Sequence, residues 1–110
     1  MKRKEFNKYL ARDIWCYHCG ITDDTLVPQH RLRRGMGGKN KRAENPANLI
    51  VLCSYMNGLI ESNAIAASNA LRYGWTIESW ENPEIRPVYD RMLGQWWFLD
   101  NDFGRRLVLL

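Results

Sequence analysis

The stretch VPQHRLRRGMGG, residues 27–38, places one of the two histidines of this chain directly before a run of arginines and glycines. The pattern over residues 25–33 predicts a short strand, interrupted by Pro28, with His30 near its end. The glycines among residues 35–42 predict a loop whose backbone can approach a ligand closely. His30 is therefore expected where a strand gives way to a basic, glycine-rich loop.

The stretches on both sides of this loop predict elements of mixed type. Apolar residues recur at helical spacing over residues 4–13 and again over residues 55–73, and Gly74 is placed to end the second helix. Residues 16–20, CYHCG, predict a tight turn of the kind that holds a metal ion. Residues 45–53, NPANLIVLC, predict a turn that leads into an apolar strand.

The last third of the chain is rich in aromatic and β-branched residues, which favour strands. The runs GWTIESW, IRPVY and QWWFL predict short strands, and DNDFG at residues 100–104 predicts the turn of a terminal hairpin. Its tryptophans are assigned to core and sheet packing rather than to base stacking, although Trp96 and Trp97 must point to opposite faces of one strand. We expect one α+β domain, with a core over about residues 12–75 and a Trp-rich β extension over residues 76–110.

The length and composition describe a small globular chain. Its 110 residues fit one domain, and no apolar run approaches the roughly 20 residues that a membrane-spanning helix needs. The basic start MKRKEFNKYL lacks the apolar centre of a signal peptide, so we expect a cytoplasmic protein. Three cysteines in a reducing compartment indicate thiols or metal ligands rather than disulfides.

Charge is distributed unevenly along the chain. Residues 1–42 carry eleven Lys and Arg against four Asp and Glu, a balance of +7, whereas residues 43–110 carry five against eight, a balance of −3. A basic half joined to a nearly neutral half is typical of a binding face on a scaffold, and nucleic acid is the usual polyanion for such a face. The alternative is a solvated surface that only aids solubility.

The three cysteines have part of the spacing of a zinc site. Cys16 and Cys19 form a CxxC pair, and Cys53 begins a second pair in which Met56 stands where a fourth cysteine is expected. His18 lies between the first two cysteines and is expected to point away from a metal that they hold. Two interpretations stay open: zinc bound by three thiolates and a water or distant ligand, or three thiols packed as small apolar groups with Met56 filling the space.

Several motifs occur together in one order. CxxCG at residues 16–20 is followed by QHRLRRGMGG, then by NPANLIVLC, MNGLIES and ALRYGW. In this order and spacing the chain resembles small HNH endonuclease-like proteins of bacteriophages that infect actinobacteria, over about residues 12–74. The resemblance implies a ββα-metal finger that holds one divalent cation, such as Mg²⁺, against the scissile phosphate. It also implies the cytoplasm of an infected bacterium as the location.

The resemblance assigns roles to particular residues. His30 falls on the position of the general base that deprotonates water, and Asn48 falls on the asparagine that steadies the loop bearing this base. Gln29, Asn57 and Asn63 fall on positions where the family has ligands for the catalytic metal. Each is a neutral amide in this chain, and an amide oxygen binds a hard cation more weakly than a carboxylate does. We therefore expect an HNH-like protein that is catalytically impaired or inactive.

The basic loop after His30 needs no metal to contact phosphates, and such binding is mostly independent of base sequence. Its cations are Arg31, Arg33, Arg34, Lys39, Lys41 and Arg42. The leading expectation is therefore a protein that binds DNA or RNA through this basic face. Two alternatives stay open: a metal-dependent endonuclease or nickase that uses His30, and an inhibitor of a host protein that docks through residues 95–110.

Overall fold

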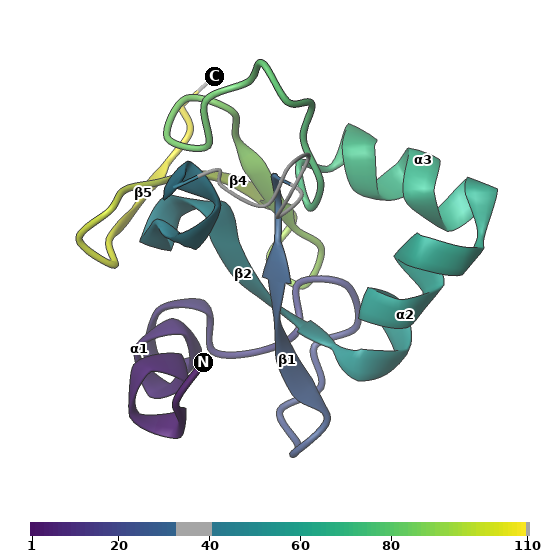
Figure 1. Ribbon diagram of the computed structural model, residues 1–110, viewed down its shortest axis with the longest axis horizontal. Coiled ribbons are helices and arrows are strands. Elements are labelled where there is room, and N and C mark those ends of the chain that lie inside the picture. Colours follow the sequence, from purple (N-terminus) through teal and green to yellow (C-terminus); the bar gives the residue numbers. More distant parts are fainter. Residues whose placement is uncertain (33–40, 110) are drawn as a thin grey trace.

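Helices and two small antiparallel sheets make up the part of the chain that the computed structural model describes, residues 1–32 and 41–109 (Figure 1). The expected α+β class is confirmed for these residues. The helices and strands, in chain order, are α1 (Arg3–Asp13), β1 (Leu26–His30), β2 (Leu49–Cys53), α2 (Ser54–Ser62), α3 (Ala64–Arg72), β3 (Val88–Asp90), β4 (Gln95–Leu99) and β5 (Arg105–Leu107). Two short 3₁₀ helices precede β2, namely η1 (Lys41–Glu44) and η2 (Pro46–Asn48).

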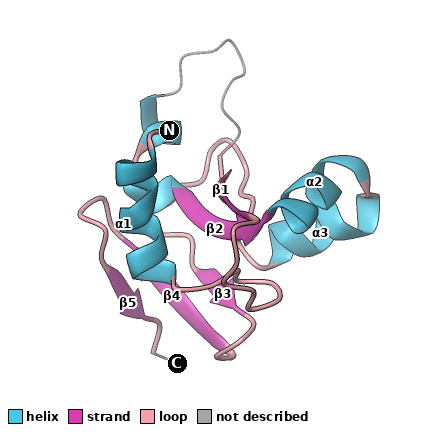
Figure 2. Ribbon diagram, turned by 90° about the horizontal axis from the view of Figure 1, so that it is seen from below, coloured by secondary structure: helices cyan, strands magenta, loops and turns pink. Residues whose placement is uncertain are grey.

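The antiparallel pair of β1 and β2 lies at the centre of the molecule. Its register sets Leu26 opposite Cys53 and His30 opposite Leu49. The predicted strand with Pro28 is confirmed, and the proline is tolerated because β1 is an edge strand of a two-stranded sheet. Every residue of β2 is buried, as its unbroken apolar sequence requires. Figures 1 and 2 show α1 on one side of this pair and α2 and α3 on the other.

The predicted N-terminal helix is confirmed as α1, which buries Phe6 and Tyr9 against the core. Its C-terminal end is tied to β2, because the carboxylate of Asp13 accepts a hydrogen bond from the backbone N–H of Val51 at 3.1 Å. Arg12 pairs with Asp13 at 2.7 Å and also donates to the carbonyl of Pro46 at 2.9 Å. Two charged residues of α1 thus fasten the helix to the core instead of facing a ligand.

The helical stretch predicted as one helix over residues 55–73 is two helices, α2 and α3. The break falls at Asn63, whose backbone is extended (φ −128°, ψ 123°) and whose side-chain oxygen accepts from the backbone N–H of Ala66 at 3.0 Å. Asparagine favours such an N-cap over a helix interior, and a pattern of apolar residues does not register this local preference. Gly74, which the sequence places at the end of this helical stretch, directly follows Tyr73, the C-cap residue of α3. Its φ is +74°, and a Cβ there would lie 2.1 Å from the carbonyl oxygen of Pro87.

The predicted terminal hairpin is confirmed as β4 and β5, to which β3 adds a third antiparallel strand. The carboxylate of Asp100 forms the turn by accepting from the backbone N–H groups of Asp102 and Gly104, both at 2.8 Å. The strand predicted for GWTIESW is wrong. Trp75 and Ile77 of that run are each buried, but the run is not a strand. Ile77 N–H donates to Arg31 O at 2.9 Å as an isolated backbone hydrogen bond, which is not part of a ladder between strands.

Candidate functional site

His30 ends β1 at the edge of the central pair. Its side chain is partly exposed, and its Nε2 lies 3.3 Å from a carboxylate oxygen of Glu44 in η1. The backbone of the next residue is held as well, since Arg31 N–H donates to Asn48 O at 2.8 Å. The imidazole therefore contacts Glu44 on one side, and part of it stays accessible from outside.

Asn48 fixes the segments that flank the basic loop. Its side chain is fully buried; Oδ1 accepts from Leu32 N–H at 2.7 Å, and Nδ2 donates to Leu32 O at 3.3 Å and Ala43 O at 2.9 Å. These three bonds tie the chain after β1 to η1, on the far side of the loop. A single buried amide can satisfy both a donor and an acceptor, which explains why asparagine suits this position.

Two of the three amides expected at the metal positions meet each other. The Nδ2 of Asn57 in α2 donates to the Oε1 of Gln29 in β1 at 2.6 Å, and Gln29 Nε2 donates to His30 O at 3.0 Å. Gln29 is buried. The third amide, Asn63, lies at the junction of α2 and α3, where its oxygen caps α3. The oxygens of Gln29 and Asn63 are thus already used as hydrogen-bond acceptors within the protein.

A pocket of about 450 Å³ opens beside His30. Its titratable lining groups are His30, the buried Arg31, Glu61 of α2 and Glu78, which follows the buried Ile77. Its apolar lining comes from Leu32, Ile60, Ala67, Leu71 and Ile77. The volume suits a small ligand, and the two carboxylates make the rim more favourable to a cation than to a bare phosphate. No motif in the sequence indicates Glu78 as a lining residue, because only the path of the chain after α3 brings it to the pocket that His30 also lines.

The structure corrects the role expected for Arg31. This side chain is fully buried and donates to backbone carbonyls: Nε to Gly74 O at 2.7 Å, and Nη1 to Ala47 O at 3.0 Å and Pro83 O at 2.8 Å. Burial is the main cause that lowers the pKa of Arg31, to about 9, and the charge of the nearby Arg86 adds to it. The guanidinium is therefore still charged at neutral pH. Its donors bind the protein's own backbone, so Arg31 does not form part of a phosphate-binding surface.

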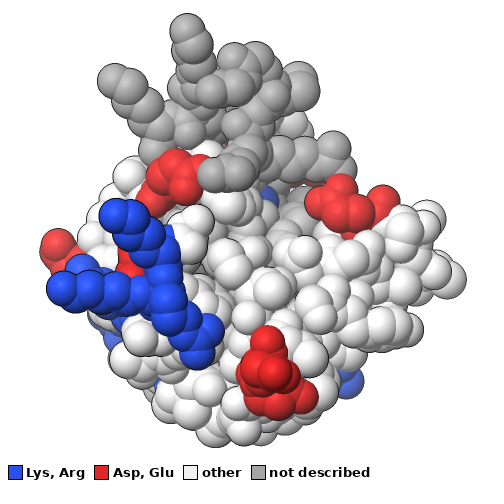
Figure 3. Space-filling model, turned by 60° about the horizontal axis from the view of Figure 1, so that its bottom comes forward, with Lys and Arg blue, Asp and Glu red and all other residues white. Residues whose placement is uncertain are grey.

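The other predicted cations of the loop fall into two groups. Arg33, Arg34 and Lys39 lie outside the described residues, as does the side chain of Lys41. Arg42 is exposed, and its guanidinium donates to Ser79 O at 3.3 Å. Further exposed cations that the structure describes near the N-terminus are Lys2, Arg3, Lys4 and Lys8. Figure 3 shows Lys and Arg side chains gathered at the left of one face, on the side where α1 lies.

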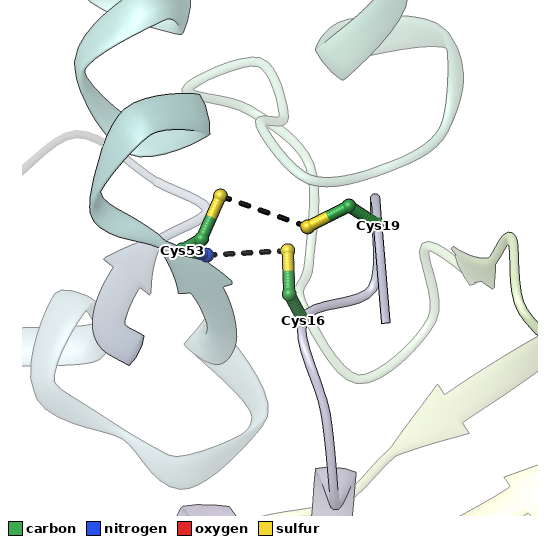
Figure 4. A group of neighbouring side chains, drawn as sticks. All are labelled: Cys16, Cys19 and Cys53. Atoms are coloured by element: carbon green, nitrogen blue, oxygen red, sulfur yellow. Dashed lines mark hydrogen bonds between the residues drawn. The ribbon is translucent and has the colours of Figure 1, made fainter. Parts of the chain in front are cut away.

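The three cysteines come together at the start of α2 (Figure 4). The sulfur atoms of Cys16, Cys19 and Cys53 all lie within 4.8 Å of one another, and those of Cys19 and Cys53 are 3.8 Å apart. Cys16 Sγ accepts from Cys53 N–H at 3.2 Å, and Cys53 Sγ accepts from Met56 N–H at 3.4 Å. Burial raises the pKa of the Cys16 thiol to about 12. The cluster is close enough to bind a metal ion.

His18 and Met56 are the two residues whose place beside the cysteine cluster the sequence left to be tested. His18 packs edge-on against Trp75, with ring centroids 5.6 Å apart, and the metal-binding group found among the described residues does not include it. Burial lowers the pKa of His18, so its neutral form is favoured. Met56 is 3% exposed, and its backbone N–H donates to Cys53 Sγ. A buried thioether at this position agrees with a residue that packs beside the thiols.

Comparisons of the chain with protein-family models, with curated proteins and with solved structures find no match. Among the residues that the structure describes, no helix has both the length and the apolar character to cross a membrane.

Proposed function

We propose that this protein binds nucleic acid, DNA or RNA, on an HNH-like ββα scaffold whose hydrolytic site is impaired. The observation that carries the proposal is the contrast around His30. The histidine stays partly exposed at the end of β1, while Gln29 and Asn57 beneath it bond to each other at 2.6 Å. A histidine stands at the position expected for the general base. Gln29 and Asn57, at positions expected for ligands of the catalytic metal, are hydrogen-bonded to each other instead.

The order of elements supports an HNH-like scaffold. β1 and β2 pair antiparallel, and α2 begins at the residue after β2, as a ββα finger requires. Asn48 holds Leu32 and Ala43, the role that the resemblance implies for the asparagine that steadies the loop. A zinc-type knuckle beside such a finger fits the three clustered cysteines.

Impaired hydrolysis follows from the chemistry of the amides. A divalent cation at Gln29 and Asn57 must break their 2.6 Å hydrogen bond. Neither amide is ionised, so these two ligands do not neutralise the charge of the ion. Asn63 would in addition give up the N-cap of α3, which stabilises a helix by about 1 kcal/mol. Each of these costs lowers the affinity for the ion.

Nucleic-acid binding draws its support from the exposed cations. Arg42 lies on the surface just after the loop, and four further cations are exposed at and before α1. Lys and Arg contacts to phosphates release counterions and need no metal, so the binding should weaken steeply as salt rises. With Glu61 and Glu78 at its rim, the pocket beside His30 is an unfavourable place for a phosphate, which leaves the loop and α1 as the contact surfaces.

The test is fluorescence anisotropy with a labelled duplex in EDTA, at several salt concentrations. We expect binding that persists without metal, with an affinity that falls linearly with salt on a double-logarithmic plot. The triple variant Lys39→Gln, Lys41→Gln, Arg42→Gln should reduce both the affinity and the salt slope. A matched triple variant that removes the same charge outside the loop and α1, Arg72→Gln, Arg91→Gln, Arg106→Gln, should leave duplex binding nearly unchanged. Absence of binding to any nucleic acid at low salt would contradict the proposal.

A second candidate function is metal-dependent cleavage, favoured by the pocket that His30 shares with Glu61 and Glu78. Two carboxylates supply the charge that the amides lack, and hard divalent cations prefer oxygen ligands. Supercoiled plasmid incubated with Mg²⁺, Mn²⁺ or Ni²⁺ decides between the functions. Nicking that disappears in both His30→Ala and Glu61→Gln would establish the enzyme, whereas nicking that persists in both would indicate a contaminant.

We also propose that the cysteine cluster holds a structural zinc ion. A tetrahedral site with Zn–S bonds of about 2.3 Å separates two sulfurs by about 3.8 Å, and Cys19 and Cys53 are 3.8 Å apart. Three soft thiolates suit zinc, and a water completes the set where Met56 replaces a fourth cysteine. Zinc would join the turn after α1 to the junction of β2 and α2.

A further inference from the structure

The outer face of the sheet formed by β3, β4 and β5 carries several aromatic rings that are partly buried and partly exposed. Neighbouring residues of a strand point to opposite faces, so Trp96 and Phe98 share one face of β4 while Trp97 points to the other. Trp97 packs against the core, together with the buried Val88 and Leu99. Figure 2 shows the central pair and α1 on one side of this sheet. The face with Trp96 is the one turned away from the core.

Three neighbouring rings contact one another, namely Tyr89 and Trp96 on this face and Tyr73, which also packs against the core. Tyr89 lies opposite Trp96 in the register, with ring centroids 4.9 Å apart. Tyr73, at the end of α3, stacks on Tyr89 with centroids 5.2 Å apart and planes 23° from parallel. Phe98 follows on the same face of β4. We call these four rings the aromatic face: Tyr73, Tyr89, Trp96 and Phe98.

Arginines flank the aromatic face at both ends. The guanidinium of Arg106 lies 4.9 Å from the ring of Phe98, and that of Arg72 lies 6.0 Å from the ring of Tyr73. Both arginines are exposed. The one acidic residue within β3, β4 and β5 is Asp90, which is buried and accepts from Trp15 Nε1 at 3.2 Å. The face therefore combines flat apolar rings with positive charge.

This combination fits one kind of polyanion. Bases of a single strand are free to stack on aromatic side chains, and the phosphates between them pair with arginine. In a duplex the flat faces of the bases are already stacked on one another, so the rings would find no partner there. A partner of negative charge also suits Arg72 and Arg106 better than a neutral one does.

We propose that the aromatic face binds single-stranded nucleic acid, with bases stacked on Trp96 and its neighbouring rings and phosphates at Arg72 and Arg106. This site extends the proposed function, since both concern nucleic acid, but it uses a different surface from His30 and the basic loop. The two surfaces together would let the protein hold a duplex and an adjoining single strand. Trp96 then has a binding role, and Trp97 has the packing role that the sequence suggested for both.

The test compares Trp96, which is partly buried on the aromatic face, with Trp80, which is exposed outside the sheet. Trp96→Leu removes a ring from the aromatic face, and Trp80→Leu removes a ring that is 78% exposed and lies outside the sheet. Binding of an oligo-dT single strand is followed by anisotropy and by quenching of tryptophan fluorescence, in parallel with a duplex probe. We expect Trp96→Leu to weaken binding of the single strand about tenfold and to remove most of the quenching. Trp80→Leu should change neither, and duplex binding should be the same in both variants.

A conservative variant separates stacking from a structural role. Trp96→Phe keeps a flat ring and should retain most of the affinity for the single strand, whereas Trp96→Leu should lose it while unchanged duplex binding shows that the variant is folded. Equal affinity of Trp96→Leu and the unaltered protein would overturn the inference. If the duplex binds and the single strand does not, the inference fails and the proposed function stands. Quenching by a neutral polysaccharide but not by oligo-dT would also overturn it, in favour of a sugar.

Discussion

The side-chain oxygen of Gln29 accepts a hydrogen bond from the side-chain nitrogen of Asn57 at 2.6 Å, which joins β1 to α2 directly beneath His30. This bond occupies the place where the resemblance implies ligands for a divalent cation. It stabilises the junction of strand and helix without any charge, and a net contribution of about 1 kcal/mol is typical for such a bond. A divalent cation at this place would have to compete with this neutral contact.

Restoring ligands at this bond should restore ion binding. In the double variant Gln29→Asp, Asn57→His, a carboxylate and an imidazole replace the two amides, and both are good donors for Mn²⁺. We expect Mn²⁺ to raise the melting temperature of the double variant and to leave the unaltered protein unchanged. Plasmid nicking that appears in the double variant and disappears on adding His30→Ala would identify His30 as the base. A variant that binds Mn²⁺ no better than the unaltered protein would contradict this reading of the site.

Arg31 should prove essential for stability. Replacing it by methionine leaves the carbonyls of Gly74, Ala47 and Pro83 without their buried donor, and each unpaired group costs about 1–3 kcal/mol. We expect a loss of at least about 3 kcal/mol in the free energy of unfolding, measured by urea denaturation. Arg3→Met, at an exposed position, should stay within about 0.5 kcal/mol. A stable Arg31→Met protein with weakened duplex binding would contradict the structural role.

Zinc content should depend on Cys53 and not on Met56. Cys53→Ser removes a buried thiolate, so the zinc-to-protein ratio measured by mass spectrometry should fall well below that of the unaltered protein. Met56→Leu keeps an apolar side chain of similar volume and should retain zinc. Equal zinc in Cys53→Ser and the unaltered protein would show that the thiols pack as apolar groups. Loss of zinc in Met56→Leu alone would make the thioether a ligand.

The buried Tyr9 should limit stability at alkaline pH. Burial raises its pKa from 10.0 to about 12, so the phenol stays protonated in the folded state over a range where it ionises in the unfolded chain. Its stabilising contribution is fully present below pH 10.0 and is lost as the pH rises through about 12. Thermal unfolding across this range should show a smaller alkaline loss in Tyr9→Phe than in the unaltered protein. Tyr17 and Cys16, whose pKa values burial also raises, contribute to the loss that remains.

The sequence by itself determined the elements whose signals are local. The period of apolar residues gave α1, the unbroken apolar run gave β2, and the DNDFG turn gave the hairpin of β4 and β5. The CxxC spacing, with Cys53 at the end of an apolar strand, was enough to expect the three thiols to meet. These features depend on neighbours within a few residues, or on one pairing of strands, so a linear pattern contains them.

Only the tertiary structure decided which of several chemically similar residues are buried in the core and which are exposed on the surface. Arg31 and Arg42 belong to one basic run, yet Arg31 is buried among carbonyls from three distant segments and Arg42 is exposed. Trp96 and Trp97 are adjacent and both partly buried, and only the structure shows that Trp97 packs against the core. Burial of a charge or a ring depends on what the rest of the chain brings against it. No pattern of neighbouring residues contains that information.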